Sequence, residues 1–214
     1  MKAGLYLGTI VLGVMLLFSC SKEMSTENGG VNSKCDYAPY TQGSSFTYLN
    51  VSTSGDSSVY TLTVNGDTTI NGNVYRKLGD STAFMCSNCT DGVYTQIASI
   101  LSFDGYTASD LRLTYLKDFL PAGSTWSDTV QVSYSGISTK ALLQYTIVQK
   151  GINKIVNGHD YTDVIGVQLD ASASTASATL PVGTVAVNYY ARGIGLIESD
   201  QTQDTTRLVN FNIK

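Results

Sequence analysis

The chain has 214 residues, with 13 Lys and Arg against 17 Asp and Glu, which gives a formal net charge of −4 at pH 7. A chain this acidic, with no basic cluster, argues against a nucleic-acid partner, because phosphate backbones are bound through Lys and Arg. The length suits one domain, and a composition dominated by Thr, Ser, Val, Tyr and Gly favours strands and turns over helices.

The N-terminus has the pattern of a secretory signal. Lys2 precedes an apolar run over residues 5–18, and Ser19-Cys20 follows it. The run of about 14 residues is shorter than the roughly 20 that a membrane-spanning helix needs. The pattern predicts a signal helix over residues 1–19 that is removed from the mature protein.

Leu17-Phe18-Ser19-Cys20 resembles the lipobox of bacterial lipoproteins, although Phe18 replaces the usual small residue. The resemblance implies that Cys20 becomes the first mature residue and carries the acyl chains, such as palmitate, that anchor the protein. Ser21-Lys22-Glu23, with no Asp beside the Cys, implies the outer membrane, at its periplasmic face or at the cell surface. An ordinary secretory signal with an incidental Cys is the alternative.

The remaining chain divides into a tether and one domain. Residues 21–34 offer little apolar surface to bury, so residues 20–38 are expected to form a flexible tether. Residues 39–214 are expected to form a single β domain. Its strands are predicted near residues 44–52, 58–66, 73–79, 82–87, 92–98, 110–116, 124–135, 138–150, 160–170, 173–180, 184–192, 194–199 and 205–213.

Apolar and polar residues alternate along these segments, as in Tyr60-Thr61-Leu62-Thr63-Val64. A period of two indicates an antiparallel sheet with one buried face. Because long contiguous strands coil together, we expect an all-β fold with a strongly curved sheet, as a half-barrel or closed barrel rather than a flat sandwich. One helical turn is allowed at residues 116–120.

Turn signals separate the predicted strands. Asn-Gly and Asp-Gly tolerate the positive φ of tight hairpins. The predicted turns are Ser54-Gly55-Asp56, Asn65-Gly66-Asp67, Asn71-Gly72-Asn73, Asp91-Gly92, Asp104-Gly105, Asn157-Gly158, Pro121-Ala122-Gly123-Ser124 and Pro181-Val182-Gly183-Thr184.

A motif pattern occurs twice, which predicts pseudo-repeats over about residues 39–115 and 119–199. The match sets Phe46 against Trp126 and Tyr60 against Tyr145. We expect Phe46 and Trp126 to be core anchors, one in each half.

Residues 189–198 read Tyr-Tyr-Ala-Arg-Gly-Ile-Gly-Leu-Ile-Glu. They resemble the YYAxGxGLI motif near the C-terminus of uncharacterised Bacteroidota lipoproteins. The resemblance implies a β-rich domain of the cell envelope whose function is unassigned. Gly193-Ile194-Gly195 is interpreted as a bend or bulge, where missing side chains let one backbone approach another.

Three mature cysteines other than Cys20 are disulfide candidates: Cys35, Cys86 and Cys89. We expect one structural bridge and one free thiol, with Cys35 joined to Cys86 or Cys89, or with a local Cys86–Cys89 bridge. Redox catalysis is disfavoured because no helix N-terminus is predicted at the first Cys of the CxxC, and a zinc site lacks ligands.

The other candidates for chemistry have simpler structural interpretations. His159, the sole His, lies in a predicted turn, and alternation places Asp160 and Asp163 on opposite faces of a strand. The 14 Tyr suit half-buried strand faces, or alternatively the faces of sugars. Other acids are scattered singly: Asp104, Asp110, Asp118 and Asp128.

The sequence therefore predicts a non-enzymatic envelope lipoprotein that binds a ligand or partner, with no catalytic residue, metal or cofactor and an unknown binding site. The membrane is the expected partner through the lipid anchor, and a small apolar ligand, a glycan or an envelope protein are further candidates. A surface glycan-binding protein and a hydrolase with distant carboxylates are the alternatives.

Overall fold

The computed structural model describes residues 35–79, 84–103, 106–134, 137–174 and 179–214. The predicted signal helix and residues 20–34 of the tether lie outside this part of the chain. Twelve strands and no helix occur in it. Accordingly, no membrane-spanning helix is found among these residues.

The strands are, in chain order, β1 (Ser45–Ser52), β2 (Ser57–Ile70), β3 (Asn73–Gly79), β4 (Phe84–Thr90), β5 (Val93–Phe103), β6 (Tyr106–Lys117), β7 (Thr125–Tyr134), β8 (Ile137–Val156), β9 (His159–Ser174), β10 (Thr179–Ala191), β11 (Gly195–Gln201) and β12 (Asp204–Asn212).

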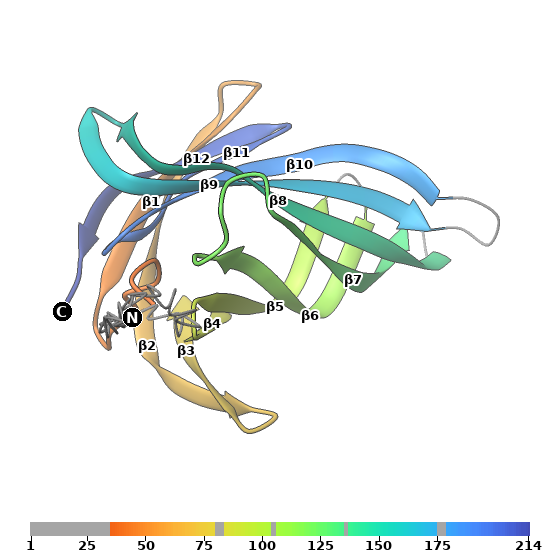
Figure 1. The fold of residues 1–214 in the computed structure, drawn as a ribbon, viewed down its shortest axis with the longest axis horizontal. Helices are drawn as coiled ribbons and strands as arrows, with labels where there is room; N and C mark the ends of the chain where they lie inside the picture. The colour runs from red at the N-terminus through yellow and green to blue at the C-terminus, as the bar shows by residue number, and fades with distance from the viewer. Residues whose placement is uncertain (1–34, 80–83, 104–105, 135–136, 175–178) are drawn as a thin grey trace, which may run out of the picture. The chain divides into compact units, whose positions relative to one another are not determined.

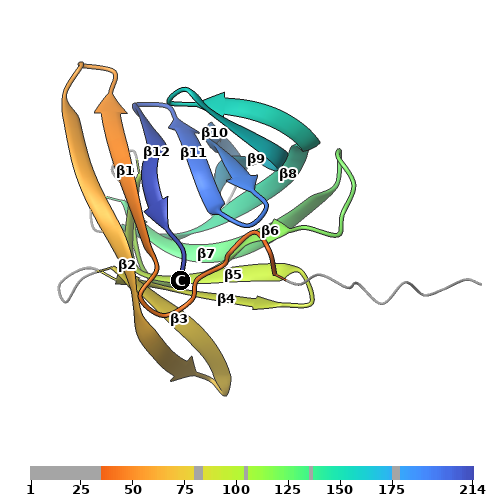
Figure 2. The ribbon, with the colours of Figure 1, turned by 90° about the vertical axis from the view of Figure 1, so that its left-hand side faces the viewer.

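Each strand pairs antiparallel with its neighbours in the sequence, and β12 pairs with β1 to close a barrel. Figure 2 shows the strands arranged around this ring. The prediction of an all-β, strongly curved antiparallel sheet is therefore confirmed, in its closed form. Strands as long as β8, with 20 residues, favour closure because the right-handed twist accumulates along them.

Short hairpin turns follow the Asn-Gly and Asp-Gly signals. Asn71, Asp91 and Asn157 all have φ near +50°, and the glycine after each also has positive φ. Two consecutive residues with positive φ suit the twist of a two-residue hairpin. These three predicted turns are confirmed.

Two other predicted turns are wrong, because they lie inside strands. Asn65-Gly66-Asp67 belongs to β2, where the pairing with β3 shifts between Val64 and Asp67. Pro181-Val182-Gly183 belongs to β10, where the pairing with β9 shifts after Pro181. A glycine with positive φ serves a β-bulge as well as a turn, so the local sequence does not distinguish them.

Strand number also differs from the prediction, which had thirteen. The expected strand at 173–180 does not exist separately, because β9 continues to Ser174 and β10 begins at Thr179. The helical turn allowed at residues 116–120 does not form. The segment after β6 is a non-helical turn in which the Leu120 N–H donates to the Lys117 carbonyl. Strands β5 and β6 also extend beyond the predicted segments 92–98 and 110–116, to Phe103 and back to Tyr106.

Two clusters of buried side chains form the core. One contains Phe46, Val64 and Ile197, and the other contains Tyr94, Ile147 and Ile165. Phe46 is a core anchor as predicted, whereas Trp126 is only partly buried and packs at the edge of the second cluster. Among the residues whose burial the structure describes, seven tyrosines are buried: Tyr37, Tyr48, Tyr75, Tyr94, Tyr145, Tyr161 and Tyr190.

The turns that lead into β1 and β7 make the same backbone bonds. Gly43 N–H donates to the Val64 carbonyl, and Gly123 N–H donates to the Ile147 carbonyl. The return bonds, from Val64 and Ile147 to the serine after each glycine, also match. In these registers Leu62 faces Phe46 and Tyr145 faces Trp126, so the match of Tyr60 with Tyr145 is displaced by two residues.

Candidate functional site

Residues 35–41, here called the strap, cross one end of the barrel (Figure 2). At one side, Cys35 is bonded to Cys89 of β4, and the Tyr37 N–H donates to the Tyr94 hydroxyl of β5 at 3.2 Å. At the other side, Gly193 N–H donates to the Asp36 carbonyl at 2.7 Å. The strap thus joins strands on opposite sides of the ring.

Tyr37 is the main anchor of the strap. Its side chain is 2% exposed, and its ring meets the Tyr94 ring edge-on at 6.5 Å between centroids. The hydroxyl donates to Asp163 Oδ1 at 3.1 Å. Burial, with the Asp163 carboxylate beside it, raises the pKa of Tyr37 to about 12. The hydroxyl therefore stays protonated and able to donate at neutral pH.

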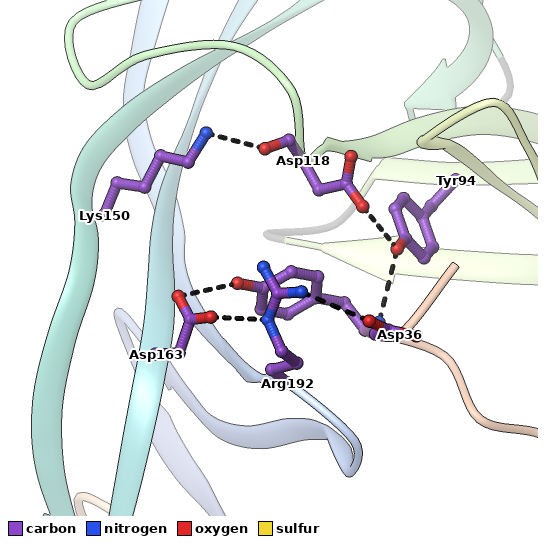
Figure 3. Close-up of polar contacts among 7 residues, drawn as sticks. Asp36, Tyr94, Asp118, Lys150, Asp163 and Arg192 are labelled. Carbon is purple, nitrogen blue, oxygen red and sulfur yellow. Dashed lines mark hydrogen bonds and ion pairs between the residues drawn. The ribbon is translucent and has the colours of Figure 1, made fainter. Parts of the chain in front are cut away.

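Arg192 links the strap to the barrel wall. Its guanidinium donates to Asp163 through Nε and to Asp36 at 3.2 Å, and it lies 5.4 Å from the Tyr37 ring centroid (Figure 3). Asp163 has φ of +52° near the start of β9, where its pairing with β8 is irregular. The irregular backbone directs this carboxylate towards Tyr37 and Arg192.

A second set of polar contacts holds the segment between β6 and β7. The Tyr94 hydroxyl donates to Asp118 at 2.7 Å, and Lys150 Nζ donates to the carbonyls of Asp118 and Leu120 at 2.7 and 2.8 Å (Figure 3). The carboxylates of this end therefore stabilise the fold through hydrogen bonds and ion pairs.

A cleft of about 410 Å³ lies between the strap and strands β3 and β4. Its lining includes Asp36 and Tyr40 of the strap, Arg76 of β3, and Ser87 and Asn88 of β4. The volume falls within the roughly 300–1,000 Å³ typical of small-molecule sites. Because the Cys35–Cys89 bridge also lines the cleft, the disulfide holds its two walls together.

The cleft offers several polar groups to a ligand. Arg76 is paired with Asp67 through one terminal nitrogen only, so its other N–H groups remain as donors. Asn88 donates to the Val74 carbonyl at 2.7 Å, and its side-chain oxygen accepts from the Thr90 hydroxyl at 3.3 Å, which fixes the amide and leaves one lone pair of that oxygen as an acceptor. The lining also contains apolar groups from Ala38, Pro39 and Val74.

No protein-family model matches the chain, and no curated protein matches it. Its fold is similar to that of a lipoprotein candidate from Parabacteroides distasonis, at 10% identity and a TM-score of 0.47, over 82% of this chain and 98% of that one. An exported-protein candidate with a YmcC-like fold from Bacteroides fragilis gives 12% identity and a TM-score of 0.48, over 81% and 97%. The hypothetical lipoprotein YmcC from Escherichia coli gives 9% and 0.43, over 79% and 88%.

The structure decides among the cysteine pairings that the sequence left open. Cys35 and Cys89 form the bridge, with a sequence separation of 54 and 5.8 Å between their Cα atoms. Cys86 is a free, buried thiol, and burial raises its pKa. Cys20, the lipidation candidate, lies outside the described residues, as does Asp104.

The remaining candidates lie apart from one another. His159 and Asp160 are exposed at the β8–β9 hairpin, while Asp163 belongs to the strap contacts. Asp128 accepts from the Thr114 N–H at 2.6 Å, on another part of the wall. Among the described residues, no three His, Cys, Asp or Glu side chains gather as metal ligands.

Sequence reasoning missed the strap and its partners. The sequence predicts residues 35–38 as part of the tether, which is wrong because Tyr37 is buried. The one useful signal was Gly193-Ile194-Gly195: Gly193 lies in the β10–β11 turn, and a Cβ on Gly195 would lie 3.5 Å from the Tyr37 carbonyl. The segment forms a turn that the strap backbone contacts, but a Cβ on Gly195 would make an ordinary van der Waals contact there. Glycine at this position is therefore favoured by its φ of +104° rather than by the approach of the strap.

Proposed function

We propose that the protein is a non-enzymatic lipoprotein of the outer membrane, anchored by acyl chains on Cys20, which binds a small polar ligand in the cleft beneath the strap. The anchor is supported by the lipobox-like residues Leu17-Phe18-Ser19-Cys20. The described cleft lies between the strap and the barrel wall, and its volume and polar lining carry the assignment of binding.

A binding role agrees with how the nearby acids are used. Asp36 and Asp163 share Arg192, and Asp118 accepts from Tyr94. A general acid or base needs a carboxyl group free to exchange its proton with a substrate. These carboxylates instead fix the strap, which forms one wall of the cleft.

The ligand is expected to carry hydrogen-bonding groups on one side and an apolar face on the other. Arg76 would bind an anionic or carbonyl oxygen, while Asn88 would accept from a hydroxyl or amine. The Tyr40 ring and Pro39 would contact the apolar face. A polar metabolite, an amino-acid derivative or one sugar unit fits this description.

The binding site can be tested by NMR on isotope-labelled protein covering residues 21–214. We would add amino acids, small carboxylates and monosaccharides one at a time. Shift changes should concentrate on the amides of residues 35–41, 74–76 and 87–89 and disappear in Asn88→Leu. Changes scattered over the barrel, or unaffected by Asn88→Leu, would contradict the proposal.

The anchor has a separate test. Intact-mass measurement of the protein purified from membranes should show acyl chains, and Cys20→Ser should remove them and release the protein to the soluble fraction. Cys86→Ser, which leaves the signal unchanged, is the matched control. An unacylated wild-type protein would contradict the anchor without affecting the cleft.

A further inference from the structure

Over the part of the chain that the structure describes, the seam between β6 and β7 is the least paired junction of the barrel wall. Among these residues its ladder contains two pairs, Tyr106 with Tyr134 and Thr107 with Ser133. On their other sides, β6 pairs with β5 over almost its whole length, and β7 pairs with β8 from Thr125 to Tyr134. Residues 108–117 and 125–132 are therefore extended strands with a ladder on one side only (Figure 1).

Two side chains bridge this seam where the main-chain ladder is missing. The Thr114 N–H donates to Asp128 Oδ2 at 2.6 Å, and the Thr114 carbonyl accepts from Trp126 Nε1 at 2.6 Å. Continuing the register of the two ladder pairs would place Thr114 opposite Trp126. One acceptor and one donor thus replace the two bonds that a facing strand residue makes in an antiparallel ladder.

The corresponding junction on the other side of the barrel is fully paired. β1 and β7 begin with the same turn bonds, so the partner of β1, strand β12, corresponds to the partner of β7, strand β6. β1 pairs with β12 through eight residues, from Ser45 to Ser52. β1 is thus paired along its length, whereas the ladder between β7 and β6 ends at Ser133 and is missing over residues 125–132.

We propose that the β6–β7 seam is an acceptor site for an extended segment of a partner polypeptide, which adds as a strand. The segment would take over the N–H and carbonyl of Thr114, release Trp126 and Asp128, and pair with the free edge of β7 along residues 125–132. This site is on the barrel wall and does not depend on ligand binding in the cleft.

The partner's chemistry follows from the edge. Main-chain bonds provide affinity without sequence selectivity, and alternate side chains would face the core cluster that contains Val130 and Val132. The outward side chains would lie beside Thr125, Ser127 and Gln131, which are exposed. An alternating apolar and polar segment without proline therefore fits best.

A peptide with the sequence of residues 204–212 provides the probe, because this strand fills the corresponding seam. Its binding to residues 21–214 of the protein is measured by fluorescence anisotropy and hydrogen exchange. We expect protection of amides in 108–114 and 125–132. A peptide with proline at the position of Leu208 should bind at least tenfold more weakly, since it lacks one donor and disrupts the strand.

Variants of the seam test the mechanism directly. Trp126→Phe with Asp128→Ala removes both bridging bonds, so the peptide should bind about tenfold tighter. Thr129→Ala, on the same strand, is the matched control and should bind as wild type. Amide exchange rates in β8 and β9 report whether each variant remains folded. If the double substitution unfolds the protein, Trp126→Phe alone is used in its place.

Three results would overturn the proposal. The first is that the proline peptide binds as tightly as the unmodified peptide. The second is that the peptide protects amides outside the seam from exchange. The third is that the peptide binds neither the wild type nor a folded Trp126→Phe variant. Sedimentation without peptide identifies a different occupant: a dimer of the double variant that peptide does not dissociate would mean that a second copy of the chain fills the seam.

Discussion

Removing the Cys35–Cys89 bridge with Cys35→Ala and Cys89→Ala should lower the free energy of unfolding substantially. The bridged residues are 54 apart in sequence. Closing a loop of that length removes enough denatured-state entropy to stabilise the fold by about 4 kcal/mol at 25 °C. Since the strap is terminal in the described domain, part of the loss will appear as local release of the strap.

Urea unfolding followed by the fluorescence of Trp126, the sole Trp, provides the assay. With a denaturant dependence of about 2 kcal/mol per molar urea, a loss of about 4 kcal/mol lowers the midpoint by about 2 M. Hydrogen exchange measures the local part, because the amides of Tyr37 and Gly193 are hydrogen-bonded through the strap contacts. Both should exchange faster in the variant.

The free thiol provides the control, because Cys86→Ala leaves the bridge intact and should cost only about 1 kcal/mol for the small cavity. An unchanged midpoint and unchanged exchange of the strap amides in the double variant would refute the reasoning. That result would mean that noncovalent contacts alone hold the strap, and that the loop is already constrained in the unfolded chain.

Three further predictions concern the barrel wall and the strap. Glu198→Gln should lower the unfolding free energy by about 2 kcal/mol, because the buried carboxylate pairs with Lys154 at 2.8 Å and Arg207 at 3.1 Å; thermal melts at low and high salt would check it, and equal melting temperatures would contradict it. Gly195→Ala should cost about 1–3 kcal/mol, because its φ of +104° is strained for a residue that carries a side chain. A melting temperature equal to that of the wild type would contradict it. Burial raises the pKa of Tyr40 to about 12. The stability that the protein gains from keeping this hydroxyl neutral is therefore full below about pH 10 and is lost as the pH rises through 12. Urea midpoints at pH 9 and 11.5 should therefore differ more in wild type than in Tyr40→Phe, and an equal difference would contradict this assignment.

The Asn-Gly sequences show which backbone features the local sequence predicts and which it does not. Asn71-Gly72 and Asn157-Gly158 form hairpin turns as expected, because two consecutive residues with positive φ are a local backbone property. Gly66 has the same conformational freedom but lies in a bulge of β2. Whether the chain reverses or continues there depends on the register with β3, which is set by packing of distant residues.

The side-chain contacts of the candidate sites also depend on residues that are distant in the sequence. The sequence left three pairings open, Cys35 with Cys86 or Cys89 and Cys86 with Cys89, and only the course of the strap selects Cys35–Cys89. The pairing of Asp163 with Arg192 joins residues 29 apart, and no spacing rule indicates it. Asp128 and Trp126 contact Thr114 because the barrel brings β6 and β7 together.

The sequence by itself determined the class of fold, the curvature expected of long alternating strands and most of the tight hairpins, since these depend on neighbouring residues and on a period of two. Only the tertiary structure decided that the sheet closes, that the strap crosses its end and forms a cleft, and that one seam remains mostly unpaired. These features depend on strand register and on contacts between residues far apart in the chain, which a local sequence pattern does not predict.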